Sequence, residues 1–324
     1  MTVFIIRRLM QSVLVLVAMS VIVFVGVYAI GDPIQILISP QADQEEIARA
    51  THALGLDRPL WSQYLHFLGG AFSGDLGTSF VFNQPAIRII LDRLPATLEL
   101  AFAAMVIAIL LGIPLGLWAG LKPDSIAGRT ITAGSILGFS LPTFWVGLMM
   151  ILVFAVQLDW LPATGRGATV DILGFRTSLL TADGLAHVAL PAFNLAVFKL
   201  ALVIRLARAG TREVVPLDYI KFARAKGLST RRVILVHVLK NILIPIVTVL
   251  GLETGSVIAF AVVTETIFAW PGVGRLIIQA INQLDRPVIV AYLLMTVSMF
   301  IVINLIVDIL YSVLDPRVRI AEAR

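Results

Sequence analysis

The chain has 324 residues, of which 59% are apolar and 14% charged, and its mean hydropathy is +0.95. This composition leaves no room for a large soluble domain and is typical of a protein that crosses the membrane several times. The absence of cysteine excludes disulfides, thiolate metal sites and cysteine nucleophiles. The net charge of +5 does not indicate a nucleic-acid partner, because no aromatic residues are interleaved with a basic patch.

Six apolar segments are long enough to span the membrane, so we expect an all-α fold with six transmembrane helices. A helix needs about 20 apolar residues to cross roughly 30 Å of hydrocarbon. Lys199 interrupts the fourth segment, which makes it the weakest of the six. The segments lie near Leu9–Ile30, Thr97–Gly120, Ile131–Val156, Leu185–Leu206, Ile242–Thr264 and Val288–Val313.

The basic residues predict the orientation of these spans. The first apolar run follows Arg7 and Arg8 but is too long for a cleaved signal and lacks a small-residue cleavage site, so residues 1–30 are expected to remain as a tail and first span. Six spans place both termini on one side. That side carries 16 lysines and arginines and the opposite side carries 8, so we expect both termini in the cytoplasm.

The first external loop, residues 31–96, is too long to be a simple connector. We expect two short amphipathic helices in it, lying on the membrane surface, docking an external partner, or both. The first helix is predicted to start at the capping pair Asp43 and Glu46 and to end at Gly55. The second is predicted to start at Pro59 and to end at Gly69–Gly70.

A charged stretch, residues 215–232, lies between the fourth and fifth spans. Pro216 favours a helix start and Gly227 a left-handed end, which predicts about three turns between them. Ser229 is expected to cap a following helix. Asp218 and Lys221 should share one face, and the pattern leaves open whether that face is solvated, contacts anionic lipid or docks a protein. An apolar stripe is expected from Leu217, Ile220 and Ala223. The small residues Ala223, Ala225 and Gly227 are expected to form a low-relief surface for a close partner.

Charged residues inside the spans cost a few kcal/mol unless they are paired or hydrated. Glu99 and Asp308 lie near span ends, where snorkelling or a structural pair is expected. Lys199 and Glu253 lie deeper. Two hypotheses stay open for them: an ion pair between the fourth and fifth spans, or positions facing a water-filled pathway.

Small residues recur every four positions in the second span, at Gly112, Gly116 and Gly120. We interpret them as a helix-packing surface, with a gating hinge as the alternative. Pro114 and Pro142 are expected to be tolerated as kinks within a helix bundle.

Several catalytic motifs are missing from the sequence. It contains no Gly-x-x-x-x-Gly-Lys-Ser/Thr phosphate loop, no His-Glu-x-x-His and no Gly-x-Ser-x-Gly, and its four histidines are scattered singly. We therefore expect a chain that is not an enzyme, hydrolyses no ATP alone and holds no cofactor or metal.

Short blocks in a fixed order run along nearly the whole chain. Two of them are residues 94–101 (Leu-Pro-Ala-Thr-Leu-Glu-Leu-Ala) and 265–274 (Glu-Thr-Ile-Phe-Ala-Trp-Pro-Gly-Val-Gly). With the others, at 54–60, 63–64, 74–79, 142–145, 161–165, 286–288, 304–308 and 315–317, they resemble the binding-protein-dependent dipeptide/oligopeptide/nickel permeases of ABC importers, specifically the first permease type of the pair.

This resemblance implies that residues 207–241 form the loop whose short coupling helix docks on an ATPase. Gly227 matches that loop's glycine and Ala223 its second alanine. Lys221 stands where the general family has glutamate, and Phe222 replaces the first alanine, as in the peptide-permease variant. The residues expected to couple to the ATPase are Asp218, Lys221, Phe222, Ala223, Arg224, Ala225 and Gly227.

The resemblance also implies an importer assembled from several subunits. Residues 97–313 would form the ABC-importer-type transmembrane domain and 314–324 a cytoplasmic tail. The chain would pair with a homologous permease in the inner membrane, with two ATPases that bind ATP and Mg and an extracytoplasmic substrate-binding protein. Small peptides are the expected substrate; nickel chelates, glutathione, sugars or opines are alternatives. A stand-alone ion-coupled carrier and, less favoured, an intramembrane enzyme remain the alternative functions.

Overall fold

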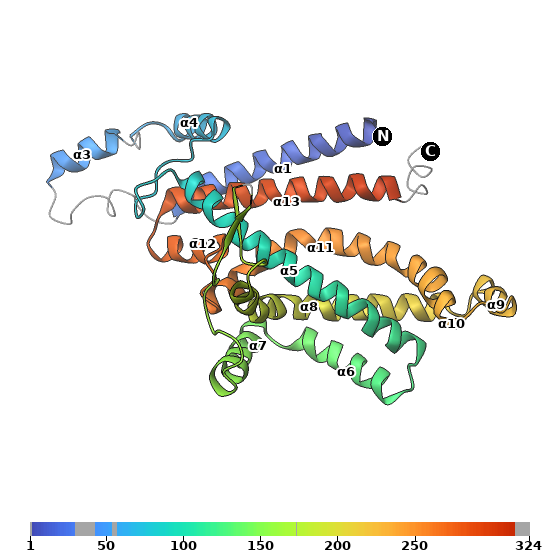
Figure 1. Cartoon of the computed structure of the whole chain (residues 1–324). Coiled ribbons are helices and arrows are strands. Elements are labelled where there is room, and N and C mark those ends of the chain that lie inside the picture. Colours follow the sequence, from blue (N-terminus) through green and yellow to red (C-terminus); the bar gives the residue numbers. More distant parts are fainter. Residues whose placement is uncertain (1, 30–42, 54–56, 173, 315–324) are drawn as a thin grey trace. The chain divides into compact units, whose positions relative to one another are not determined.

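The structure is a computed structural model that describes residues 2–29, 43–53, 57–172 and 174–314. The chain divides into two compact units, Pro95–Pro271 and the combination of Met1–Leu94 with Gly272–Arg324. Helices make up most of both units, as the hydropathy predicts (Figure 1). Asp308 and the block 315–317, which the sequence singles out, have no described side chains.

The unit formed by Met1–Leu94 and Gly272–Arg324 is built on two long helices in contact, α1 (Thr2–Ala29) and α13 (Arg286–Leu314). The short helix α4 (Leu60–Ser73) contacts α1, and α12 (Val273–Asn282) contacts α13. A further short helix, α3, covers Gln44–Ala53.

The two expected loop helices are present, with different ends. Asp43 accepts a hydrogen bond from Glu46 N at 2.8 Å at the start of α3, as its capping pattern predicts; the predicted stop at Gly55 lies outside the described residues. Pro59 directly precedes α4. The predicted stop at Gly69–Gly70 is wrong, because the helix continues to Ser73 and ends at Gly74, whose φ is +78°.

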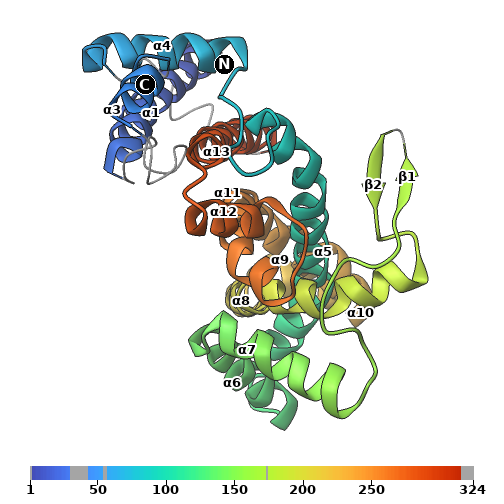
Figure 2. The same cartoon turned by 90° about the vertical axis from the view of Figure 1, so that its left-hand side faces the viewer.

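The unit Pro95–Pro271 is centred on α8 (Ala182–Val214), which packs against α11 (Leu239–Ile267), α6 (Ile126–Ser140) and α7 (Thr143–Met150). Helix α5 (Ala86–Leu121) enters it from residue 95. Seen along the helices, two short antiparallel strands stand beside them (Figure 2). The shorter elements are the π-helical turns η1 (Ile151–Gln157) and η2 (Val233–Val238), the strands β1 (Val170–Ile172) and β2 (Phe175–Thr177), and the helices α9 (Asp218–Ala225) and α10 (Thr230–Arg232).

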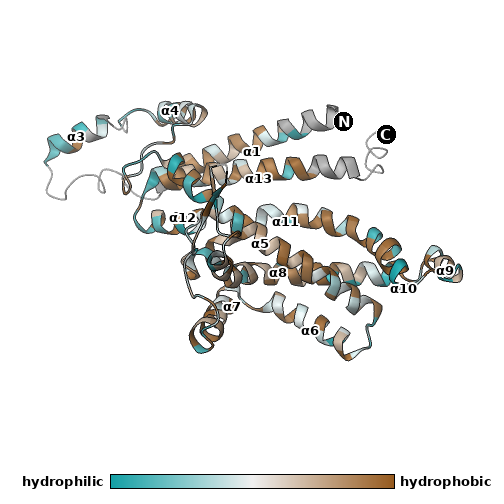
Figure 3. Cartoon of the chain, in the orientation of Figure 1, coloured by the Kyte–Doolittle hydropathy of each residue, from teal (hydrophilic) through white to brown (hydrophobic). Residues whose placement is uncertain are grey.

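Four helices of the described chain are long and apolar enough to cross a membrane: Ala86–Leu121, Ala182–Val214, Thr230–Ile267 and Arg286–Val307. The brown colouring of these helices in Figure 3 marks their hydrophobic residues. The third predicted span, Ile131–Val156, is not one straight helix. Two helices, Ile126–Ser140 and Thr143–Gln157, meet there at 109° and would make a fifth span if counted together. Pro142 lies at the break and removes a helix hydrogen-bond donor. The apolar part of α1, Met10–Gly26, is shorter than the 18 residues of a full candidate.

The glycines of α5 pack against α8. A Cβ added at Gly112 would lie 2.7 Å from Val203 Cγ1, and one at Gly116 would lie 2.5 Å from Ala207 Cβ. Gly120 leaves equally little room against α8. Because each glycine lets the helix backbones approach more closely than a side chain would permit, the geometry supports the packing interpretation.

Candidate coupling helix and the polar contacts of the spans

Helix α9 lies at one end of α8 and α11, and the two strands lie at the other (Figure 1). It has eight residues, so the predicted length of about three turns is too long. The chain leaves α9 through Gly227, whose φ of +76° is left-handed as predicted, and Gly227 N donates to Arg224 O. Ser229 then caps α10 by accepting from Arg232 N at 3.4 Å.

One face of α9 is buried in this chain's own core. Ile220 is fully buried and Ala223 nearly so. They belong to a cluster with residues of α5, α8, η2 and α11: Leu117, Val203, Ala207, Val233, Val238, Ile242, Ile246 and Leu250. Ala223 therefore offers no low-relief surface to a partner, which corrects that expectation, and Leu217 is too exposed to complete the apolar stripe.

The opposite face of α9 is exposed and combines charge with aromatic rings. Lys221 Nζ lies 2.9 Å from Asp218 Oδ1, the expected pair one helical turn apart. Phe222 is 62% exposed, and Lys226 Nζ lies 4.6 Å from the centre of its ring. Tyr219 is also exposed, although it is not among the residues that the sequence resemblance assigned to ATPase coupling. Its amphipathic ring, which is typical of interface residues, could have indicated it. The remaining exposed residues of the predicted set are Arg224, Ala225 and Gly227.

Lys199 and Glu253 meet between α8 and α11. Lys199 Nζ donates to Glu253 Oε2 and, at 2.8 Å, to Ser256 Oγ. The lysine side chain is almost completely buried, whereas the glutamate is partly exposed. A lysine on a span needs such a partner, because an unpaired charge in hydrocarbon costs several kcal/mol.

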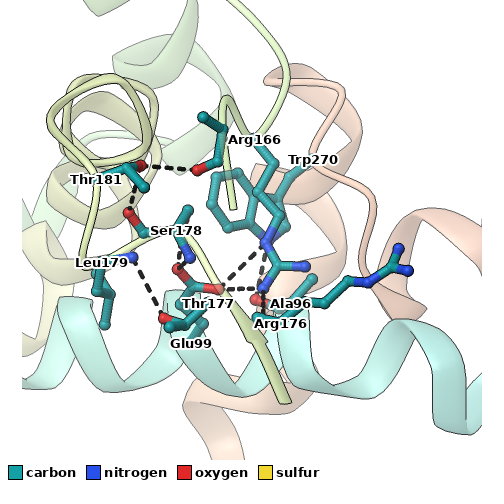
Figure 4. A network of polar contacts seen from close by, with 10 residues as sticks. Ala96, Glu99, Arg166, Arg176, Thr177, Ser178, Leu179, Thr181 and Trp270 are labelled. Atoms are coloured by element: carbon teal, nitrogen blue, oxygen red, sulfur yellow. Dashed lines mark hydrogen bonds and ion pairs between the residues drawn. The ribbon is translucent and has the colours of Figure 1, made fainter. Parts of the chain in front are cut away.

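Glu99 on α5 is buried in a polar network rather than snorkelling to the surface (Figure 4). Its carboxylate accepts from the Arg166 guanidinium and from Ser178 N, the latter at 2.7 Å. Arg166 also donates to Arg176 O, in the middle of β2, at 2.5 Å. Sequence reasoning missed Arg166, because only its position directly after the block 161–165 marked it.

Three of the sequence blocks converge around this network. Trp270 Nε1 donates to Ala96 O at 2.9 Å, and Thr97 Oγ1 donates to Glu265 Oε1 at 2.5 Å. Gly165 N donates to Phe268 O at 2.9 Å. The blocks 94–101, 161–165 and 265–274 therefore specify one buried junction, which we call the α5 junction.

Two other blocks meet in the unit formed by Met1–Leu94 and Gly272–Arg324. Ser79 Oγ donates to the buried Asp285 carboxylate, and Phe80 N donates to its Oδ1 at 3.2 Å. A Cβ on Gly77 would lie 3.4 Å from Pro287. These contacts hold the end of the first loop against the start of α13.

Among the described residues, no group of three or more histidine, cysteine, aspartate or glutamate side chains could hold a metal ion. Glu99 and Lys199, which lie on helices, form ion pairs with Arg166 and Glu253, respectively.

The long apolar helices define the chain as a multi-pass membrane protein. The chain belongs to the family described as "binding-protein-dependent transport system inner membrane component". That family matches residues 112–320, and the N-terminal family that accompanies it matches residues 1–101. The chain is accordingly a multi-pass protein of the inner membrane.

Several named permeases match this chain over nearly their whole length. The dipeptide transport system permease protein DppB of Escherichia coli K12 is 40% identical, with 98% of each chain covered. The oligopeptide permease AppB of Bacillus subtilis is 38% identical (98% and 99% covered), and the glutathione permease GsiC of E. coli O6:H1 is 36% identical (98% of each). An inward-facing MetNI methionine ABC transporter chain shares the fold, with a TM-score of 0.55, 17% identity, and coverage of 71% of this chain and 98% of that one.

Proposed function

We propose that this chain is the non-catalytic permease subunit of an ATP-driven importer that moves small peptides across the inner membrane by alternating access. Its membership of the inner-membrane component family supports the transport role. The names of its relatives, which include dipeptide, oligopeptide and glutathione permeases, support a peptide substrate. Nickel chelates, sugars and opines remain alternative cargoes.

The single observation that carries the coupling role is that one face of α9 is buried in the core while the opposite face is exposed. Its exposed face presents Phe222 and Tyr219 as anchors for a groove in a partner ATPase. Its buried face, through Ile220 and Ala223, is packed into the core that joins α5, α8 and α11. Because packed cores transmit displacement with little compression, a shift of the ATPase would move these helices together.

The proposed arrangement of the whole chain is the one that the sequence predicts. Residues 1–30 hold a tail and the first span, 31–96 an extracytoplasmic loop and 97–313 the transmembrane domain with its coupling loop 207–241, before a cytoplasmic tail at 314–324. Six spans leave both termini in the cytoplasm. The partners are a homologous permease, two ATPases that bind ATP and Mg, an extracytoplasmic substrate-binding protein and the lipid membrane.

Reconstitution of the complete importer in liposomes tests this function. ATP inside the vesicles, with binding protein and a labelled dipeptide outside, should give uptake and ATPase activity that both depend on the binding protein. The matched control replaces the lysine of the Gly-x-x-x-x-Gly-Lys-Ser/Thr motif in the partner ATPase. This substitution should abolish both uptake and ATPase activity. Uptake by the isolated chain under an ion gradient would contradict the proposal and favour a stand-alone carrier.

A further inference from the structure

The unit formed by Met1–Leu94 and Gly272–Arg324 contains an apolar groove of about 450 Å³ between α1, α4 and α13. Val13 and Val17 line it from α1, Ala71 and Phe72 from α4, and Leu294 from α13. We propose that this groove binds one acyl chain of a membrane phospholipid. The inference rests on the proposed function only in that α1 and α13 lie in the membrane.

The lining of the groove is almost entirely apolar. It includes two side-chain hydroxyls, and both are already bonded within the chain. Ser20 Oγ donates to Val17 O at 2.8 Å and lies 2.8 Å from Tyr64 Oη, and Ser298 Oγ donates to Leu294 O at 2.8 Å. A peptide or other polar ligand would lose its hydrogen bonds to water there without replacement, whereas an alkyl chain has none to lose.

The apolar lining of the groove is continuous with the exposed, lipid-facing surface of α1. Val13 and Val17 are more than half exposed although they line the groove, and Leu14, Ile22 and Val25 extend the same apolar exposure along the helix. Phe72 at the edge of α4 is 90% exposed. In a membrane the medium beside such a surface is hydrocarbon, so the available occupant is an acyl chain.

Contacts between α1 and α4 form the groove without help from a ligand. The Phe24 ring lies 5.2 Å from that of Tyr64 and 5.8 Å from that of Phe67, measured between ring centres. Together with the hydroxyl contact of Ser20 and Tyr64, these rings fix α4 against α1. Binding to a formed groove avoids the cost of ordering it, so one chain should be held more firmly than the surrounding lipid.

Lipid retention by the purified importer complex tests the proposal. The complex is exchanged into lipid-free detergent, and bound phospholipid is counted by native mass spectrometry. Ala71→Phe fills the groove, and Val302→Phe is the matched control, because Val302 is an exposed residue of α13 that does not line it. We expect the wild-type complex and Val302→Phe to retain one more phospholipid per permease than Ala71→Phe.

A second readout guards against misfolding of the filled variant. Delipidation should lower the melting temperature of the wild-type and Val302→Phe complexes by several degrees and leave that of Ala71→Phe nearly unchanged. Equal lipid retention in all three complexes would overturn the proposal, as would a cross-link from Ser298→Cys to a segment of another subunit inside the groove. Neither readout measures transport, so a failure here is distinguishable from a failure of the proposed function.

Discussion

Glu99 and Arg166 form a buried ion pair that joins α5 to the loop before the strand pair. The pair holds together segments 67 residues apart in the sequence, and the same carboxylate accepts from Ser178 on the far side of the strands. One glutamate therefore closes both ends of the loop that carries β1 and β2. This explains why a charge is retained near the end of a span, where it would otherwise be costly.

Arg166→Ala should destabilise the α5 junction. Removing one partner of a buried pair leaves the other charge unpaired, which costs about 3–5 kcal/mol. We expect a lower melting temperature of the purified complex and loss of most uptake. Arg176→Ala is the matched control, because only the backbone carbonyl of Arg176 contacts Arg166 and its side chain is exposed. If the two variants melted together with the wild type, the junction would not be a stabilising element.

Gly116→Ala should test the packing of α5 on α8. The added Cβ would lie 2.5 Å from Ala207 Cβ and 2.7 Å from Ile204 O, so the backbones must separate at a cost of about 1–3 kcal/mol. Gly134→Ala on α6 is the control, because its Cβ would meet nothing within 4 Å. Thermal unfolding should separate the variants, with Gly134→Ala at or above the wild type. A normal melting temperature for Gly116→Ala would favour the hinge alternative.

Charge reversal should distinguish the two hypotheses for Lys199 and Glu253. Lys199→Glu and Glu253→Lys each place like charges together between α8 and α11, so each should lower uptake and stability. The double reversal should recover much of both. Arg129→Glu, at an exposed position on α6 outside the coupling loop, is the control and should retain uptake. Failure of the double variant to recover would instead favour a role in a water-filled pathway.

Local sequence signals predicted several helix caps and helix ends of this chain correctly. Asp43 caps α3, Ser229 caps α10 and Gly227 ends the α9 segment in a left-handed conformation, because each of these features depends on residues within one turn. The hydropathy likewise identified the long helices. Gly74 as the end of α4 was missed, because two earlier glycines carried the same signal.

Features that depend on tertiary packing could not be predicted in the same way. A proline such as Pro142 permits a break, but its 109° angle depends on how the two helices pack against neighbours. Arg166 as the partner of Glu99 required knowledge of which loop closes over α5. The burial of Ala223 depends on the side of α9 that faces α8 and η2, which the helical pattern alone left undecided.

A substitution within α9 and one directly after it should have different effects on coupling and stability. Gly227→Pro forces a φ near −65° on a residue that has +76°, so it should change the exit from α9 and uncouple ATP hydrolysis from uptake. Ala223→Phe instead overfills the core and should lower the melting temperature by several degrees. ATPase activity, uptake and melting temperature are measured on the same complexes. Normal coupled uptake in both variants would exclude α9 from coupling.

The most direct test of the central claim is a cross-link from the outer face of α9. The chain contains no cysteine, so Phe222→Cys introduces a unique thiol on that face, and Trp160→Cys introduces one at an exposed position in the segment before the strand pair. In the assembled importer, a short bifunctional thiol reagent should join position 222 to a cysteine placed in the ATPase groove, with a yield that changes when ATP is added. Position 160 should give no such product. Absence of a cross-link at 222 in an active complex, or equal yields at both positions, would contradict the assignment of α9 as the coupling helix.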